Sequence, residues 1–462
     1  MATFSLNTLN GTTGFVIRGI DANDQSGTAV AAFDANGDGT TDIVVAAPFA
    51  DVGAQSDAGE LYVLYGGGGA FSGAATYDLS TMTAADGFIV SGTNGTGAGT
   101  QNNTDIGDRI GSSLGSLGDI NGDGVADLAF GAIGTDKNAV AAVVADSGSV
   151  TVAFGGTLSA NVSAGAITGG SGLGFVIEGF NPQDYVGNAV SAAGDVNGDG
   201  LADMIVGGFR ANPAGKVDAG ESFLLFGDAA LGGTNVNLAQ LTAPQGIRIR
   251  GASANETAGW SVKTAGDVNG DGFDEILIGA PGSGASNSGA AYMLFGKSAA
   301  GWAATGGVVD LASLTASDGV KISYANATGK ANGQIGAAVS TAGDFNADGF
   351  QDIVVGGYGN GTGETYVIWG HGGAWSNVNL SNITASTGTR FTGPSTGSQF
   401  GYAVTNAGDF NGDGIDDIAV TAPLANVTGL TSAGEVYIFY GDATRWQTAN
   451  SFTAASQVGT AF

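Results

Sequence analysis

Short apolar runs bounded by glycine recur along the whole chain, and no long stretch has the 3.6-residue spacing of an amphipathic helix. Continuous runs such as Ile43–Val45 and Ile353–Val355 are typical of a strand that is buried on both faces. The alternating run at 403–408, which precedes another such apolar run, is typical of a further strand. The pattern therefore predicts an all-β fold of short strands.

Two more strand patterns complete each repeat. The first starts and ends at glycine with an aromatic residue between, as in Gly59, Tyr62 and Gly66, and it weakens to Gly148, Thr151 and Gly155 in the second repeat. The second reads Gly-x-x-apolar-x-Gly, with tyrosine as the last residue of one copy, and occurs at Gly14–Gly19, Gly87–Gly92, Gly174–Gly179, Gly246–Gly251, Gly319–Tyr324 and Gly388–Gly393. Four short strands between glycine turns predict repeated four-stranded antiparallel sheets, the blades of a β-propeller.

The repeats are expected to form one domain. A single sheet cannot bury both of its faces, so neighbouring sheets must stack, although the length alone favours about three domains. We therefore expect one β-propeller over residues 1–462, with six blades, or seven as the alternative. The approximate repeats are 1–92, 93–179, 180–251, 252–324, 325–393 and 394–462.

Composition narrows the chemistry. The chain of 462 residues has 85 glycines, one histidine and no cysteine, which excludes Cys/His zinc sites, iron–sulfur clusters, a Cys–His catalytic pair and disulfides. The net charge of −29 comes from 42 acidic and 13 basic residues and argues against nucleic acid or anionic lipid as a partner. Apolar residues make up 43% of the chain, which suffices for a core.

Targeting signals are not evident. Residues 1–30 lack the basic segment and apolar block of a secretory signal peptide. No segment approaches the roughly 18 consecutive apolar residues of a membrane helix, so no membrane span is expected.

One nine-residue motif, Asp-x-Asn-x-Asp-Gly-x-x-Asp, occurs six times. The copies start at Asp34, Asp119, Asp195, Asp267, Asp344 and Asp409, and are separated by 85, 76, 72, 77 and 65 residues. Each copy lies between the first and second predicted strands of its repeat. Because no gap is twice the usual length, each repeat has one copy.

The spacing of oxygen-bearing residues in this motif predicts a calcium site. Calcium takes six to eight oxygen ligands, and positions 1, 3, 5 and 9 supply side-chain oxygens while position 7 supplies its carbonyl. Asn-Gly and Asp-Gly pairs also form plain hairpin turns, but turns do not require carboxylates at positions 1, 5 and 9. The candidate ligands are Asp34, Asn36, Asp38, Thr40, Asp42; Asp119, Asn121, Asp123, Val125, Asp127; Asp195, Asn197, Asp199, Leu201, Asp203; Asp267, Asn269, Asp271, Phe273, Glu275; Asp344, Asn346, Asp348, Phe350, Asp352; and Asp409, Asn411, Asp413, Ile415, Asp417.

Two loops depart from the motif, and we expect their affinities to differ from the rest. Glu275 replaces aspartate at position 9 of the fourth loop, and Ala347 replaces glycine at position 4 of the fifth. The six loops together contain 18 of the 42 acidic residues, and six Ca²⁺ ions would change the net charge from −29 to −17. We therefore expect calcium removal to destabilise the protein.

These residues resemble the FG-GAP repeat family, which includes the amino-terminal β-propellers of integrin α subunits. Phe400-Gly401 matches the first part of the family name, and Gly279-Ala280-Pro281 matches the second. The resemblance implies calcium loops between the first and second strands and an extracellular recognition scaffold. Integrin propellers have seven blades, only some of which carry metal, whereas all six loops of this chain have the ligand residues.

The two ends of the chain add strand copies. The strand at Gly14–Gly19 precedes every acidic loop, and we expect it to complete the last blade. The final residues 459–462 repeat the start of 388–393, which leaves one copy surplus for six blades. That copy is a tail, the start of a seventh blade, or a strand that pairs with another molecule.

Catalytic motifs are weak. Residues 111–115 match Gly-x-Ser-x-Gly but fall on a predicted first strand, and residues 295–298 resemble only the end of a phosphate-binding loop. Acidic residues outside the loops stand three positions before a repeat glycine and are interpreted as turn residues: Asp24, Asp108, Asp184 and Glu256. The five tryptophans are interpreted as packing residues, with a sugar-binding face as the alternative.

The sequence thus predicts a non-enzymatic, calcium-binding protein that is secreted or on the cell surface and serves adhesion, recognition or matrix assembly. Its expected partners are protein or glycan ligands, with self-association through a terminal strand as an alternative. Export through a carboxy-terminal signal of the type I route is the expected path. A carbohydrate- or lipid-active hydrolase on the same scaffold is the other alternative.

Overall fold

The protein is almost entirely β-strand over the residues described by the structure, a computed structural model. These residues are 9–10, 14–67, 75–94, 106–139, 142–325, 329–359, 361–427, 430–446 and 451–454. They include one short α-helix, α1 (Ala299–Ala304), and several one-turn 3-10 helices. The predicted all-β class is confirmed, and none of the helices in these ranges is long and apolar enough to cross a membrane.

The described strands form five sheets of five strands, one of three strands and two of two strands. In the order of neighbouring strands, the first two large sheets are β2 (Val30–Phe33), β3 (Asp42–Ala47), β4 (Glu60–Leu64), β6 (Gly87–Ser91), β12 (Val162–Ser163); and β7 (Ile110–Gly118), β8 (Asp127–Ala132), β11 (Ser149–Ala153), β13 (Gly174–Glu178), β17 (Val236–Asn237). The third and fourth are β14 (Ala189–Gly194), β15 (Asp203–Gly208), β16 (Glu221–Leu225), β18 (Gly246–Arg250), β22 (Val308–Asp310); and β19 (Ser261–Gly266), β20 (Glu275–Ala280), β21 (Ala290–Leu294), β23 (Gly319–Ser323), β27 (Val378–Asn379). The fifth and sixth are β24 (Ala338–Gly343), β25 (Asp352–Gly357), β26 (Glu364–Ile368), β28 (Gly388–Thr392), β32 (Ser451–Thr453); and β29 (Val404–Gly408), β30 (Asp417–Ala422), β31 (Glu435–Phe439).

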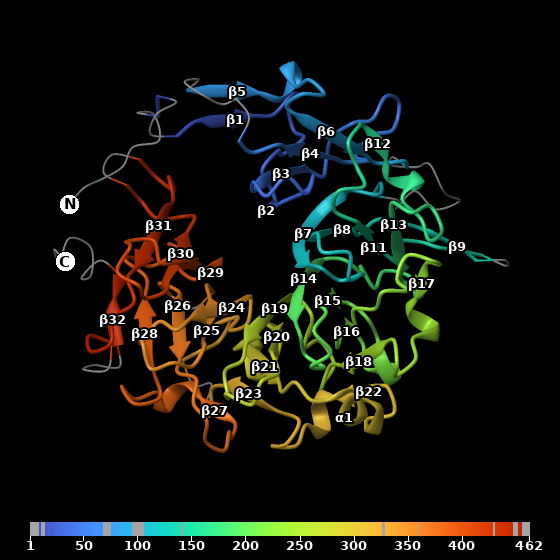
Figure 1. Ribbon diagram of the computed structural model, residues 1–462. Helices are drawn as coiled ribbons and strands as arrows, with labels where there is room; N and C mark the ends of the chain where they lie inside the picture. The colour runs from blue at the N-terminus through green and yellow to red at the C-terminus, as the bar shows by residue number, and fades with distance from the viewer. Residues whose placement is uncertain are drawn as a thin grey trace. The chain divides into compact units, whose positions relative to one another are not determined.

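The four strands predicted for each repeat are present in the first five repeats and lie side by side in chain order, whereas the sheet of the sixth repeat has three strands among the described residues. In the fifth sheet, for example, β24, β25, β26 and β28 lie side by side and are antiparallel (Figure 1). The second strands carry the continuous apolar runs, and β8, β20 and β25 are buried at every residue. A strand buried on both faces explains why its sequence does not alternate.

Five of the sheets have a fifth strand that was not predicted, so the expectation of four strands per sheet is wrong for them. Each fourth strand has a short parallel neighbour that comes from the following repeat: β6 pairs with β12, β13 with β17, β18 with β22, β23 with β27 and β28 with β32. These neighbours have only two or three residues, too few for a hydrophobic period to be visible.

The side chain at the end of such a strand caps the one-turn helix that follows. Asp78, Asn237, Asp310 and Asn379 each accept a hydrogen bond from the backbone N–H two residues later. Short Asp and Asn side chains favour this conformation because their oxygen satisfies a backbone donor at the helix start.

The strand at Gly14–Gly19 forms as β1 (Val16–Arg18) and pairs in parallel with β5 (Thr76–Asp78). This is the pairing that fourth strands make with the next repeat, so β1 has the character of a fourth strand. The predicted closure of the last sheet by β1 stays a prediction, and residues 459–462 lie outside the described residues. The other two-stranded sheet is β9 (Lys137–Ala139) with β10 (Ala142–Val144).

The chain divides into two compact units, which are described separately. The first comprises Met1–Ala192, Leu201–Gly208 and Leu225–Gln245; the second comprises Ala193–Gly200, Phe209–Leu224 and Gly246–Phe462. In the first, residues of the first two sheets, including Leu61 and Phe130, share one core cluster. In the second, the fourth and fifth sheets share another through Met293 and Tyr366, and the fifth and sixth share a third through Phe391 and Phe439. Within each unit these sheets therefore pack against one another through shared hydrophobic cores.

Candidate metal centre

The first acidic loop lies between β2 and β3 and is folded around the carboxylate at position 1. Asp34 accepts hydrogen bonds from the backbone N–H groups of Gly37 at 2.8 Å, Asp38 at 3.1 Å and Gly39 at 2.7 Å. The Asn36 Oδ1 atom accepts the N–H of Asp38, and the Asp38 Oδ1 atom accepts the N–H of Thr40. Glycines at positions 4 and 6 have φ of +76° and +83°, which permits this tight loop.

The same hydrogen bonds recur in the other loops. The position 1 carboxylates that accept the N–H groups of positions 5 and 6 are Asp119, Asp195, Asp267, Asp344 and Asp409. The position 3 amides that accept the N–H of position 5 are Asn121, Asn197, Asn269, Asn346 and Asn411. The structure therefore brings the predicted residues of each repeat into a local loop of constant geometry.

The carboxylate at position 9 is the first residue of the second strand and is fully buried in all six repeats. In the first repeat Asp42 accepts the N–H of Ala35 at 2.9 Å and that of Gly66, just after the third strand, at 2.7 Å. The position 9 side chains of the other repeats bind the equivalent glycines, which are Gly155, Gly227, Gly296, Gly370 and Gly441. This side chain thus joins the loop to the centre of its own sheet.

Burial also controls the charge at position 9. Loss of solvent raises the pKa of Asp127 to about 7 and the pKa of Asp352 to about 8, and the neighbouring carboxylates of the same loops raise them further. Burial raises the pKa of Glu275 to about 8 in the same way. A cation bound near position 9 would therefore favour the ionised form of this side chain.

The two loops that depart from the motif also depart in structure. In the fourth loop the Asn269 side-chain N–H₂ donates to Glu275 at 3.0 Å, whereas in the other five loops the equivalent amide donates to position 5. In the fifth loop Ala347 adopts φ of +57°, and its N–H faces the Asp344 carbonyl at 3.4 Å in place of the carboxylate. The longer Glu275 side chain and the Cβ atom of Ala347 account for these differences.

The donor set of each loop fits calcium by its chemistry. In the described ranges no three Asp, Glu, His or Cys side chains are grouped so as to hold an ion, because the loop carboxylates turn toward the loop's own N–H groups. An ionised carboxylate has about four lone-pair sites, and Asp38 and Asp42 each use two. The remaining lone pairs and the carbonyl of position 7 make an all-oxygen set of the kind calcium takes.

The first five loops also contact the sheet that follows them. The carbonyl at position 2 accepts a hydrogen bond of 2.8–3.0 Å from the chain just after the third strand of the next repeat. The pairs are Ala35 with Gly156, Ile120 with Asp228, Val196 with Lys297, Val268 with His371, and Phe345 with Asp442. The loops are therefore junctions between successive sheets, a role that the sequence did not reveal because a carbonyl leaves no side-chain signal.

Successive loops also touch one another through positions 7 and 8. A Cβ atom on Gly198 would lie 2.6 Å from the Phe273 ring, which is position 7 of the next loop. Asp274, position 8 of that loop, accepts the backbone N–H of Asp195 at 2.8 Å, and Asp416 accepts that of Asp344 at 3.0 Å. Asp274 and Asp416 are functional candidates that sequence reasoning missed, since a carboxylate at position 8 occurs in only these two loops.

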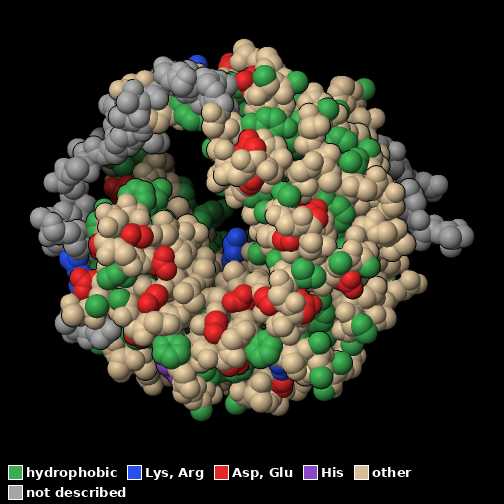
Figure 2. Space-filling view, in the orientation of Figure 1, with side chains coloured by type: hydrophobic (Ala, Val, Ile, Leu, Met, Phe, Trp, Pro, Cys, Tyr) green, Lys and Arg blue, Asp and Glu red, His purple; other side chains and the backbone are tan. Residues whose placement is uncertain are grey.

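The acidic residues outside the loops have structural partners, as the turn interpretation expects. Asp108 accepts hydrogen bonds from the Asn94 N–H and the Thr93 hydroxyl, and Glu256 accepts from Ser253 and from the Tyr292 hydroxyl. The Gly-x-Ser-x-Gly match at 111–115 lies within strand β7, as predicted. On the face shown in Figure 2, carboxylate side chains occur in several separate groups.

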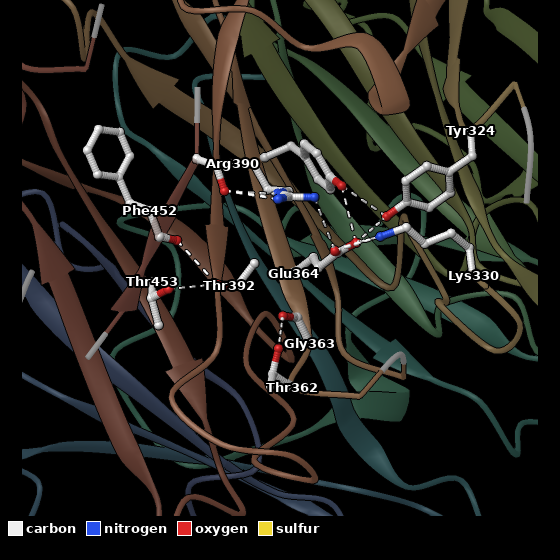
Figure 3. Close-up of polar contacts among 11 residues, drawn as sticks. Tyr324, Lys330, Thr362, Gly363, Glu364, Arg390, Thr392, Phe452 and Thr453 are labelled. Carbon is white, nitrogen blue, oxygen red and sulfur yellow. Dashed lines mark hydrogen bonds and ion pairs between the residues drawn. The ribbon is translucent and has the colours of Figure 1, made fainter. Parts of the chain in front are cut away.

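Glu364, at the start of β26, is a carboxylate with several close partners (Figure 3). Lys330 donates to both of its oxygens at 2.6 and 2.8 Å, and the Tyr324 hydroxyl donates at 2.5 Å. Arg390 lies on its other side at 3.7 Å. Burial raises the pKa of Glu364, but the hydrogen bonds and charges of these partners outweigh burial and lower it overall. An ionised, fully paired carboxylate of this kind stabilises the fold and is not suited to proton transfer.

Comparison with known proteins shows four FG-GAP repeats, at residues 26–64, 258–294, 336–368 and 400–439. Each matched segment contains one acidic loop with the strands on both sides of it. The second and third loops lie outside the matched segments.

The chain is also similar to segments of larger proteins. Human integrin alpha-6 is 39% identical over 106 residues, which are 22% of this chain and 8% of that protein. Integrin alpha pat-2 of Caenorhabditis briggsae is 30% identical over 267 residues, 54% of this chain and 20% of that protein. Bovine phosphatidylinositol-glycan-specific phospholipase D is 36% identical over 107 residues, 22% of this chain and 12% of that protein. The chain therefore spans a fifth or less of each of these relatives.

Proposed function

We propose that this chain, which contains FG-GAP repeats like those of integrin alpha subunits, is a calcium-binding β-propeller for recognition or adhesion. The six acidic loops would each hold one Ca²⁺, and the six repeats would each form one blade. The proposed ligand is a protein or glycan, and the proposed location is the cell surface or the extracellular space. Export would use a carboxy-terminal signal.

One observation carries the calcium proposal. In every repeat a fully buried carboxylate at position 9 lies at the end of a loop that contains two more carboxylates and an amide oxygen. Calcium bound there would supply two positive charges to offset this cluster. Because the first five loops also contact the next sheet through their position 2 carbonyls, the ion would stabilise the junctions between successive sheets.

The ligand residues would have distinct tasks. Position 9 is anchored to the second and third strands and would fix the base of the site. In the first loop Asp34 and Asn36 are half-buried and Asp38 is exposed, and these positions would close over the ion from the outside. The position 7 carbonyl, for example that of Thr40, would complete the set.

Calorimetric titration of metal-stripped protein with Ca²⁺ tests the proposal. We expect saturable binding with a stoichiometry near six, and an Asp123→Asn variant should lose about one site because Asp123 is position 5 of the second loop. Asp21→Asn is the matched control, since Asp21 is an exposed aspartate outside the loops. Absence of Ca²⁺ binding, or an unchanged stoichiometry in Asp123→Asn, would contradict the calcium role.

We propose a non-enzymatic role although one relative is a phospholipase. The matched segment is only 12% of that enzyme, and Asp108 and Glu256 of this chain are engaged in local hydrogen bonds. Hydrolysis of a lipid or glycan substrate by purified protein, abolished by substituting a carboxylate outside the loops, would establish the enzymatic alternative instead.

A further inference from the structure

A pocket of about 230 Å³ opens beside the fifth sheet, between the end of β26 and the one-turn helix η9 (Leu380–Asn382). Its lining includes Trp369, His371 and Trp375 from the segment after β26, and Asn377 and Asn382 from the segment around β27. None of the residues that line the pocket belongs to an acidic loop, so the calcium proposal does not use them as ligands.

Stacked aromatic rings form one wall of this pocket. The His371 and Trp375 rings are nearly parallel, at 8°, with centroids 4.3 Å apart. The Trp375 indole is 9% exposed and donates its Nε1–H to the His371 carbonyl at 3.2 Å, so the pair is held in place from within. His371 is exposed and is the one histidine of the chain.

One ring nitrogen of His371 is an acceptor and the other is a donor. Its Nδ1 atom accepts the backbone N–H of Gly373 at 3.1 Å. In the neutral ring the proton is therefore on Nε2, which can donate to a ligand. The wall thus presents an aromatic ring together with one N–H donor.

The polar groups of the lining are only partly used by the protein. Asn377 accepts the backbone N–H of Lys321 through Oδ1 at 2.8 Å, and its N–H₂ group makes no hydrogen bond within the described ranges. The exposed side chains of Asn382 and Ser376 make none with the described residues either. An amide offers both donors and an acceptor, which matches the hydroxyl groups of a polyol.

The charge and the size of the pocket limit the ligands that it can bind. No Asp, Glu, Lys or Arg lines the pocket, although the chain has a net charge of −29. A pocket with aromatic walls and a few uncharged polar groups suits a neutral ligand that has both apolar and hydroxyl surface. Its volume is below the roughly 300–1,000 Å³ of pockets for drug-sized molecules, so the ligand must be small.

We propose that this pocket binds one ring of a neutral carbohydrate, with the sugar against the His371 ring and its hydroxyl groups on Asn377, Asn382 and Ser376. The proposal specifies a glycan as the ligand of the recognition role proposed above. Sugar binding itself can be tested without that role. The segment that carries His371 also donates its N–H to Val268 of the fourth acidic loop at 2.9 Å. Calcium in that loop would hold the pocket wall more firmly.

Fluorescence titration of the full chain tests the proposal, because Trp369 and Trp375 line the pocket. The probes are neutral hexoses and N-acetylhexosamines, with glucuronic acid as the acidic comparison. We expect saturable binding of at least one neutral sugar. Asn382→Ala should weaken it about three- to tenfold, as expected for the loss of one hydrogen bond. Gln240→Ala is the matched control, since Gln240 is the exposed last residue of the corresponding one-turn helix of another repeat.

Two histidine variants separate stacking from hydrogen bonding. His371→Phe keeps the ring and removes the donor, and His371→Ala removes both, so binding should weaken in that order. The proposal is overturned if no neutral sugar saturates, if glucuronic acid alone binds, or if Asn382→Ala binds as tightly as the unsubstituted chain. Sugar titration in calcium and in EDTA, together with the calorimetric Ca²⁺ titration, distinguishes the two proposals. A protein that binds sugar but no calcium would refute only the calcium role.

Discussion

At the scale of single residues, Ala347 marks a point of backbone strain within the repeat. It occupies position 4 of the fifth loop with φ of +57°, where the glycines of the other loops have φ near +75° to +80°. A residue with a Cβ atom in this region costs roughly 1–2 kcal/mol. We expect Ala347→Gly to increase the free energy of unfolding by about 1 kcal/mol in urea denaturation, less the entropy that glycine adds to the unfolded chain.

The reverse change in another loop is the control. Gly37 has the same position in the first loop, and a Cβ atom there would make ordinary contacts of 3.7 Å with Val125. Gly37→Ala should therefore lower the free energy of unfolding by about 1 kcal/mol, through backbone strain alone. Equal stability of Ala347→Gly and the unsubstituted chain would show that the loop has relaxed around the alanine.

Glu364 gives a residue-scale prediction about pH. Because its partners Lys330, Tyr324 and Arg390 lower its pKa in the folded state, its stabilising contribution is present above the unfolded pKa, near 4.3. That contribution is lost as the pH falls through the lower folded pKa. Glu364→Gln should cost about 2 kcal/mol at pH 7, because it leaves the half-buried Lys330 and Arg390 without their carboxylate partner, and the difference should shrink below about pH 4.

Chemical denaturation of both proteins between pH 3 and pH 8 measures this difference. Asp318→Asn is the control, because Asp318 pairs with Lys297 at 2.8 Å but its side chain is 37% exposed. An exposed pair contributes about 0–1 kcal/mol, so this variant should change little. A pH-independent loss in Glu364→Gln would mean that its ionisation does not contribute.

At the scale of elements, the sequence identifies the four antiparallel strands of each repeat because each has its own period and its own glycine boundaries. It also identifies the acidic loops, because a plain turn does not require carboxylates at a fixed spacing. It does not identify strands such as β17 and β27, whose two residues have no period of their own. Nor does it identify the pocket at His371, whose lining residues all lie between 368 and 387 but are brought together by an irregular segment without a repeating pattern.

Contact between successive loops gives a prediction at this scale. Asp274→Ala removes the acceptor of the Asp195 N–H and weakens the contact between the third and fourth loops. We expect a loss of about 1–2 kcal/mol in unfolding free energy and weaker calcium binding at one site beyond any change at the fourth loop. Urea denaturation and calorimetric titration measure the two effects.

Thr41→Ala is the control for this prediction, because Thr41 holds the same position 8 in the first loop and is exposed. Calcium affinity and stability should stay near those of the unsubstituted chain. Identical behaviour of Asp274→Ala and Thr41→Ala would refute coupling through the Asp274 carboxylate.

At the scale of the whole molecule, acidity and stability are linked through the loops. The chain has a net charge of −29, and 18 of its 42 acidic residues lie at loop positions 1, 5 and 9. We expect excess EDTA to lower the melting temperature by several degrees, because a ligand at 100 times its Kd stabilises the folded state by about 2.7 kcal/mol per site. Differential scanning calorimetry in calcium and in EDTA, at matched ionic strength, measures the shift.

Adding calcium back after EDTA should restore the original melting temperature. Adding Na⁺ that carries the same total positive charge should not. An unchanged melting temperature in EDTA would mean that the loops are held by their own hydrogen bonds alone.

The pairing of each fourth strand with a strand of the next repeat limits how the molecule can be divided. A fragment cut at a sequence boundary, for example after residue 324, would keep β23 and lose its neighbour β27 (Val378–Asn379). The exposed edge of β23 would then be free to join other chains. A cut after β27 would keep that strand with β23 but would separate β26 from β28, its partner in the fifth sheet. Protein engineers who excise, permute or graft these repeats must therefore supply the missing strand, because neither cut keeps both sheets whole.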